Sequence, residues 1–89
     1  MYTKALIYSK LNCPYCVKVE SILNKAGIPV EKKILGEDVD IEEFKLILPN
    51  AKTVPQIYMY NNSEEVYIGG YIELMTELKN AKLIDWTTT

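Results

Sequence analysis

The segment Leu11-Asn12-Cys13-Pro14-Tyr15-Cys16 contains both cysteines of the chain, and it follows closely on an apolar run, Ala5-Leu6-Ile7-Tyr8. From Pro14 onward apolar residues recur at helical spacing, so the cysteines lie at the junction of a predicted strand and a predicted helix. Two cysteines one helical turn apart can close a small disulfide ring, and the first would meet the unpaired N–H groups and positive dipole end of the helix. Since that environment stabilises a thiolate, the segment predicts thiol–disulfide chemistry.

Other uses of the cysteine pair fit the sequence less well. A structural zinc site needs about four ligands, and the chain has no histidine and no further cysteine. A structural disulfide between Cys13 and Cys16 would close only a very small loop and constrain the unfolded chain little. Burial as an unreactive thiol stays open for Cys16 more than for Cys13, which precedes Pro14 at the helix entrance. We therefore interpret the pair as redox-active.

Composition limits the remaining possibilities. The 89 residues and 48% hydrophobic content predict one small globular domain over residues 1–89. The formal net charge of -2 argues against a general nucleic-acid binder. No apolar run approaches the ~20 residues that span a bilayer, and the first residues do not resemble a secretory signal. We expect a soluble, cytoplasmic monomer with no nucleic-acid or membrane partner, frayed only at residues 86–89.

The hydrophobic pattern predicts an α/β domain in which a four-stranded mixed sheet is flanked by three helices, in the order βαβαββα. The predicted elements are a buried strand at 5–8, a helix at 14–26, a more polar edge strand at 30–35, a short helix at 41–48, a hairpin of strands 56–60 and 65–68, and a helix that begins near Tyr71. Asp40 and Glu43 have the spacing of a capping box for the short helix. The last helix should bury one apolar face, formed by Leu74, Met75, Leu78 and Ala81.

Three motifs resemble the glutaredoxin pattern in order and spacing: Cys13-Pro14-Tyr15-Cys16, Thr53-Val54-Pro55 and Gly69-Gly70-Tyr71. A CxxC pair alone would resemble only the wider thioredoxin superfamily, whereas the tyrosine inside the pair and the double glycine resemble dithiol glutaredoxins. The resemblance covers roughly residues 4–78. It implies a thioredoxin-like fold and a glutathione-dependent thiol–disulfide oxidoreductase, with glutathione as co-substrate and no bound metal or organic cofactor.

The resemblance also implies roles for individual residues. Cys13 would be the attacking thiolate, and Cys16 would resolve mixed disulfides with protein substrates. The residues implied to contact glutathione are Lys10, Tyr15, Thr53, Val54, Pro55, Gly70, Tyr71, Ile72 and Glu73. Lys10 would pair with a ligand carboxylate and help to lower the thiol pKa of Cys13.

The Val54–Pro55 bond is open to two interpretations from its residues alone, a cis peptide or a trans proline that starts a strand. The resemblance implies the cis form, with the N–H and C=O of Val54 turned outward to pair with an extended peptide. The Gly69-Gly70 pair would let the backbone approach a ligand at the start of a helix whose N–H groups can hold a carboxylate.

The sequence departs from the family after the double glycine. Many glutaredoxins carry serine or threonine and then aspartate, where this chain has Ile72 and Glu73. A hydroxyl is lost, and the carboxylate is one methylene farther from the backbone on a more mobile side chain. We expect the glutamyl end of glutathione to bind more weakly as a result.

Two rival functions stay open. A redoxin of glutaredoxin-like sequence could take its electrons from thioredoxin reductase, and an iron–sulfur carrier could hold a cluster between two subunits with glutathione. Pro14 makes the second less favourable, since the family's dedicated carriers resemble CGFS at this motif. Disulfide-containing or glutathionylated proteins would be the partners. Ribonucleotide reductase is a common partner of such proteins, but no residue here encodes it.

Overall fold

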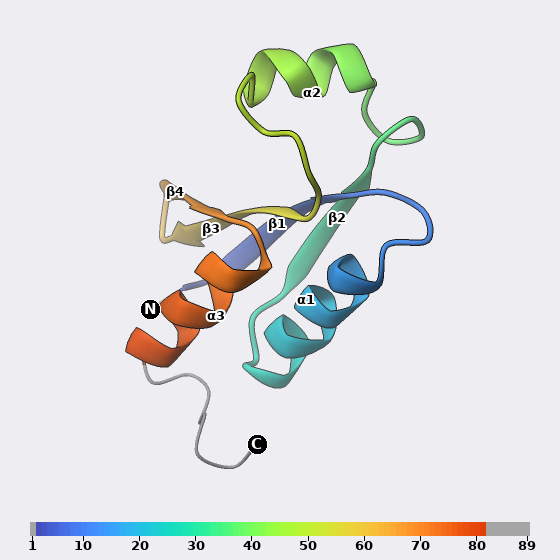
Figure 1. Cartoon of the computed structure of the whole chain (residues 1–89). Coiled ribbons are helices and arrows are strands. Elements are labelled where there is room, and N and C mark those ends of the chain that lie inside the picture. The colour runs from blue at the N-terminus through green and yellow to red at the C-terminus, as the bar shows by residue number, and fades with distance from the viewer. Residues whose placement is uncertain (1, 82–89) are drawn as a thin grey trace.

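The computed structural model describes residues 2–81, and its elements follow the predicted order (Figure 1). The strands and helices are β1 Lys4–Ser9, α1 Pro14–Lys25, β2 Val30–Ile34, α2 Ile41–Ile47, β3 Gln56–Asn61, β4 Glu64–Gly69 and α3 Tyr71–Asn80. The expected fraying at residues 86–89 lies outside the described residues. Within residues 2–81 no helix is long and apolar enough to cross a membrane.

The four strands form one mixed sheet in the order β2-β1-β3-β4. β1 runs parallel to β2 and antiparallel to β3, which is antiparallel to β4. Every residue of β1 after Lys4 is buried, as predicted from its unbroken apolar run. The more polar β2 lies at an edge of the sheet, also as predicted.

One face of the sheet is covered by both α1 and α3, which lie side by side below the sheet in Figure 1. Since successive strand residues point to opposite faces, Ala5 and Ile7 of β1 face these helices. The main core forms here, and its fully buried members include Ile7, Val19, Leu23, Ile57, Met59, Leu74 and Leu78. This packing fixes the N-termini of α1 and α3 relative to the sheet.

The opposite face carries α2 (Figure 1), and a row of aromatic rings packs there. Phe44 of α2 packs on Tyr8, with ring centroids 5.3 Å apart, and Tyr8 in turn meets Tyr58 at 6.2 Å. Burial raises the pKa of Tyr8 and of Tyr58 above the ordinary value. Burial and then a hydrogen bond to the Glu65 carboxylate raise the pKa of Tyr60 to about 12. This face is therefore aromatic and partly polar, unlike the aliphatic face beneath α1 and α3.

Two local predictions are wrong. Asp40 is the N-cap residue of α2, but its side chain makes no capping hydrogen bond, so no capping box forms with Glu43. Both residues are exposed, so solvent competes with the backbone N–H groups for their carboxylates. Ala81 is exposed rather than buried because α3 ends at Asn80, and Ala81 is already its C-cap residue.

Candidate active site

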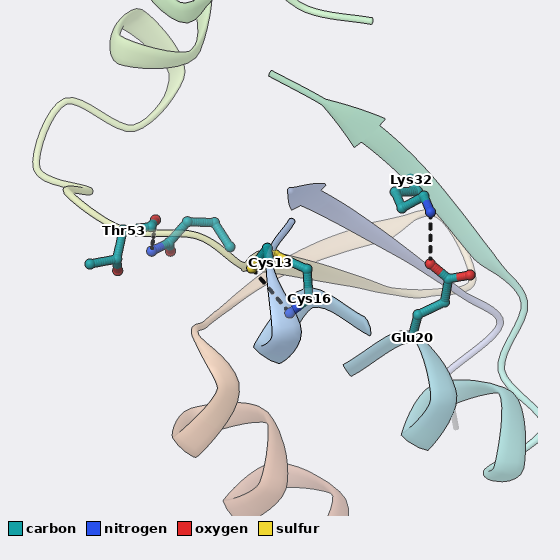
Figure 2. The surroundings of a disulfide bond; sticks show 6 residues. Cys13, Cys16, Glu20, Lys32 and Thr53 are labelled. Carbon is teal, nitrogen blue, oxygen red and sulfur yellow. Dashed lines mark hydrogen bonds and ion pairs between the residues drawn. A yellow bond between two sulfur atoms is a disulfide. The ribbon is translucent and has the colours of Figure 1, made fainter. Parts of the chain in front are cut away.

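Cys13 and Cys16 are joined by a disulfide at the N-terminus of α1 (Figure 2). Their Cα atoms are 5.2 Å apart, and both residues are buried. Cys13 is the N-cap residue of α1, and its Sγ accepts a hydrogen bond from the Cys16 N–H at 3.2 Å. The sulfur of Cys13 therefore occupies the position where a capping oxygen would otherwise satisfy a free helix N–H group.

The local sequence creates this arrangement. Asn12 adopts a positive φ of 58°, which asparagine tolerates better than most residues, and turns the chain from β1 toward α1. Pro14 follows at the first helical position, where its missing N–H costs no hydrogen bond. The first turn of α1 contains no acidic residue, so no carboxylate there would repel a thiolate at the helix N-terminus. After reduction the position favours a thiolate at Cys13, which is the reactive species in disulfide exchange.

A groove of about 370 Å³ opens next to the cysteine motif. Three segments that are far apart in sequence form it: the motif itself, the loop before β3 and the start of α3. The residues that line it are Tyr15, Thr53, Val54, Pro55, Gly70, Tyr71, Ile72 and Glu73. These are eight of the nine residues predicted to contact glutathione, so the fold brings those three sequence motifs together.

Tyr15 and Tyr71 form the aromatic part of the groove. Their ring centroids are 5.2 Å apart, and the Lys18 Nζ lies 5.3 Å from the centroid of the Tyr15 ring. Tyr15 is 54% exposed. The Tyr15 ring thus contacts two other side chains while it still presents surface to a ligand.

Val54 provides unpaired backbone groups in this groove. The Val54–Pro55 bond is cis, as the resemblance implied. Within residues 2–81 neither the N–H nor the C=O of Val54 has a hydrogen-bond partner, whereas the neighbouring Thr53 carbonyl accepts a bond from the Gln56 side chain at 3.0 Å. Two free backbone groups on one residue can pair with the backbone of an extended ligand.

The start of α3 forms the other side of the groove. Gly69 ends β4 with a φ of +115°, and Gly70 is the N-cap residue of α3. Glu73 folds back on this turn, and its Oε1 accepts a hydrogen bond from the Gly70 N–H at 2.7 Å. Ile72 is exposed in the groove. The contact predicted between Glu73 and glutathione stays a prediction, and one oxygen of the Glu73 carboxylate already accepts the hydrogen bond from the Gly70 N–H.

Lys10 is the predicted ligand contact that lies outside this groove. It lines two neighbouring hollows, one with Cys13 and the other with Thr53 and Val54. A lysine side chain is long enough for its charge to serve either hollow. Its predicted pairing with a ligand carboxylate also stays a prediction.

Two polar residues of this region were not singled out from the sequence. Lys52 precedes Thr53 and lines the same hollow as Lys10, and its position directly before the Thr53-Val54-Pro55 motif was the available signal. Gln56 is a buried amide at the start of β3 that donates to Thr53. The sequence pattern predicts only that Gln56 is the first residue of a strand. Residues 2–81 contain no group of three or more potential metal ligands among histidine, cysteine, aspartate and glutamate.

The chain is similar to known proteins both in sequence and in structure. A model of the Glutaredoxin family matches residues 5–70. Glutaredoxin 1 of Rickettsia felis is 30% identical over 80 residues, covering 88% of this chain and 74% of that protein. The solution structure of the dithiolic glutaredoxin 2-C-Grx1 from Trypanosoma brucei brucei is similar, with a TM-score of 0.67 at 26% identity, covering 91% of this chain and 82% of that one.

A buckwheat glutaredoxin, solved as a complex with glutathione, has the same fold. Its TM-score to this structure is 0.68 at 24% identity, and the similarity covers 89% of this chain and 71% of the buckwheat chain. The predicted four-stranded mixed sheet with three helices is thus the fold of known glutaredoxins.

Proposed function

This chain belongs to the glutaredoxin family of thiol oxidoreductases, and we propose that it reduces protein–glutathione mixed disulfides and protein disulfides with glutathione as electron donor. The observation that supports this most directly is the position of the Cys13–Cys16 pair. It lies at the N-terminus of α1, next to a groove with free backbone groups at Val54.

For a glutathionylated protein, the Cys13 thiolate attacks the glutathione sulfur. A bond forms between Cys13 Sγ and that sulfur, the original disulfide breaks, and the protein thiolate leaves and takes up a proton. The thiolate of a second glutathione then attacks the same glutathione sulfur. Glutathione disulfide is released, and Cys13 returns as a thiolate, so each protein thiol that is freed consumes one free glutathione, and the disulfide passes from the substrate to glutathione disulfide.

For a protein disulfide, Cys13 attacks one substrate sulfur and the other leaves as a thiolate. Cys16 loses its proton and attacks Cys13 Sγ, which breaks the mixed disulfide and closes the Cys13–Cys16 bond. Two glutathione molecules then reduce that bond in succession. The two cysteines are close enough for this step, since their Cα atoms are 5.2 Å apart when bonded.

Glutathione suits the groove chemically. It is an extended tripeptide with a backbone that can pair with Val54, and its carboxylates suit the N–H groups at the start of α3 and the charge of Lys10. The buckwheat glutaredoxin of the same fold was solved with glutathione. We further propose that the chain acts as one domain and as a monomer, and that it works in the cytoplasm, where glutathione keeps thiols reduced.

A coupled assay tests the proposal. The reduced protein is supplied with a small glutathione mixed disulfide as substrate, once with glutathione and glutathione reductase and once with thioredoxin reductase. We expect turnover in the first system. Turnover with thioredoxin reductase alone would instead establish the redoxin alternative. Visible absorbance of an iron–sulfur cluster after anaerobic purification, without turnover in either system, would establish the carrier.

A further inference from the structure

Gln56 is a buried amide whose two ends are both engaged. The residue is 6% exposed and lies directly after Pro55 at the start of β3. Its Nε2 donates to the Thr53 carbonyl at 3.0 Å, the bond drawn beside Thr53 in Figure 2, and its Oε1 accepts a hydrogen bond from the Tyr67 hydroxyl. A buried amide without partners would be costly, so these two bonds determine the orientation of the side chain.

The Tyr67 hydroxyl is itself held in place by ring packing. Tyr67 belongs to β4, and its ring centroid lies 5.2 Å from that of Tyr58 on β3. Tyr58 continues the aromatic row through Tyr8 on β1. Two hydrogen bonds in series therefore connect the loop before β3 to the sheet, from Tyr67 to Gln56 and from Gln56 to Thr53.

These hydrogen bonds engage one backbone group of the loop, the Thr53 carbonyl, and leave the N–H and C=O of Val54 free, with no partner within residues 2–81. A flexible loop would have to be ordered when a ligand binds, at a cost in conformational entropy. A loop already fixed through its Thr53 carbonyl presents the Val54 groups in one orientation.

We propose that Gln56 and Tyr67 are positioning residues that hold Thr53 and Val54 ready to pair with the backbone of a glutathionyl or extended peptide substrate. The inference rests on the proposed function. Neither side chain lines the groove, so each acts through the loop and not through contact with substrate. Their loss should therefore weaken substrate binding without slowing attack by Cys13.

Tyr67→Phe is the most selective variant, because it removes one hydroxyl from a side chain that is 49% exposed. Tyr60→Phe is a matched control, since it removes a hydroxyl that donates to Glu65 in the same hairpin, at 2.9 Å. With a glutathionylated peptide as substrate, we expect Tyr67→Phe to raise KM about 2- to 5-fold at unchanged kcat, and Tyr60→Phe to change neither. Gln56→Leu leaves the Thr53 carbonyl without its donor and should raise KM about 5- to 10-fold.

Two measurements separate positioning from general loss of structure. The ¹³C resonance of the Thr53 carbonyl in the free protein should shift in Tyr67→Phe and Gln56→Leu but not in Tyr60→Phe. The alkylation rate of Cys13 should match the wild type in all three. A KM for Tyr67→Phe equal to that of Tyr60→Phe, or a fall in kcat in place of a rise in KM, would overturn the inference.

Failure of the proposed function has a different signature. In that case the wild type would not turn over with glutathione, and the Thr53 resonance would still report the hydrogen bond. The ratio of KM values between Tyr67→Phe and the wild type would then be measured with a disulfide-bonded peptide and thioredoxin reductase. A ratio of one would reject the positioning role, and a raised ratio would support it.

Discussion

The two walls of the groove have different chemistry. The loop wall, Thr53–Pro55, offers the unpaired N–H and C=O of Val54 and is tied to the sheet through Gln56. The helix wall, Gly70–Glu73, is the N-terminus of α3, and the Gly70 N–H is already bonded to the Glu73 carboxylate. One wall therefore presents free neutral groups, and the other presents a helix end that its own side chain partly neutralises.

The two walls should therefore contribute to binding in different ways. Neutral backbone pairing at the loop wall depends on geometry and responds little to salt. Charged contacts at the exposed helix wall are weak and are screened by salt. We therefore expect changes near the loop wall to alter KM at any ionic strength, and charge changes at the helix wall to matter mainly at low salt.

The largest effect is predicted for removal of the Cys13 thiol, which attacks the substrate that both walls would bind. Cys13→Ser should abolish all activity, because it removes the thiolate that begins both reactions. Cys16→Ser should still deglutathionylate small substrates, since only protein-disulfide reduction requires the second thiol. The two variants are compared in the glutathione reductase assay with a glutathione mixed disulfide and with a disulfide-bonded protein. An inactive Cys16→Ser variant toward the mixed disulfide would show that the assigned roles are wrong.

The next prediction concerns the ionisation of Cys13, which lies in the motif beside the groove. Its position as the N-cap of α1, with no acidic residue in the first turn, should bring its thiol pKa well below the free value of about 8.5. Cys16 lies one turn inside the helix and should titrate at higher pH. The measurement is the rate of iodoacetamide alkylation of the reduced protein against pH, with Cys16→Ser isolating Cys13. Reaction of Cys13 only above pH 8 would contradict the prediction.

Much of this site follows from sequence because its parts lie in short local motifs. Pro14 and the helical spacing after it place the cysteine pair at a helix start, and the apolar run 5–8 identifies the central strand. The approach of Tyr15 to Tyr71 could not be derived this way, because no local pattern joins segments so far apart. Only the resemblance to glutaredoxins predicts that the three motifs lie together in the fold.

The role of Gln56 could not be predicted from the sequence, because neither its burial nor its hydrogen-bond partner has a local signal. A polar residue after a proline at the start of a strand is ordinarily exposed, and nothing local shows that Gln56 is buried. Its partner Tyr67 follows 11 residues later, and the pairing of β3 with β4 shifts register between Ile57 and Tyr58. Such a bulge re-aims side chains at a strand end and has no reliable sequence signal.

A smaller effect is expected from side chains added at the start of the helix wall. Gly69 has a φ of +115°, and a Cβ there would lie 3.0 Å from Glu73 Cγ. Gly69→Ala should therefore lower the free energy of unfolding by about 1–3 kcal/mol. Gly70→Ala is the matched control, because its φ of -97° suits any residue. Its Cβ would lie 3.2 Å from Oε1 at the flexible end of Glu73 and at an ordinary 3.6 Å from the Pro55 carbonyl oxygen. Urea denaturation measures both, and equal losses would show that backbone strain is not the cause.

The smallest predicted effect decides what Glu73 does at the helix wall. Glu73→Gln keeps an oxygen that can accept the Gly70 N–H bond, so the start of α3 is preserved while the negative charge is removed. If the second carboxylate oxygen binds the ammonium of the glutamyl end of glutathione, the loss of an exposed ion pair should raise KM by about 1.4- to 5-fold, corresponding to ~0.2–1 kcal/mol. The rise should shrink as salt is added. A fall in KM would mean that the carboxylate repels the ligand's own carboxylate, and that Glu73 serves only to cap α3.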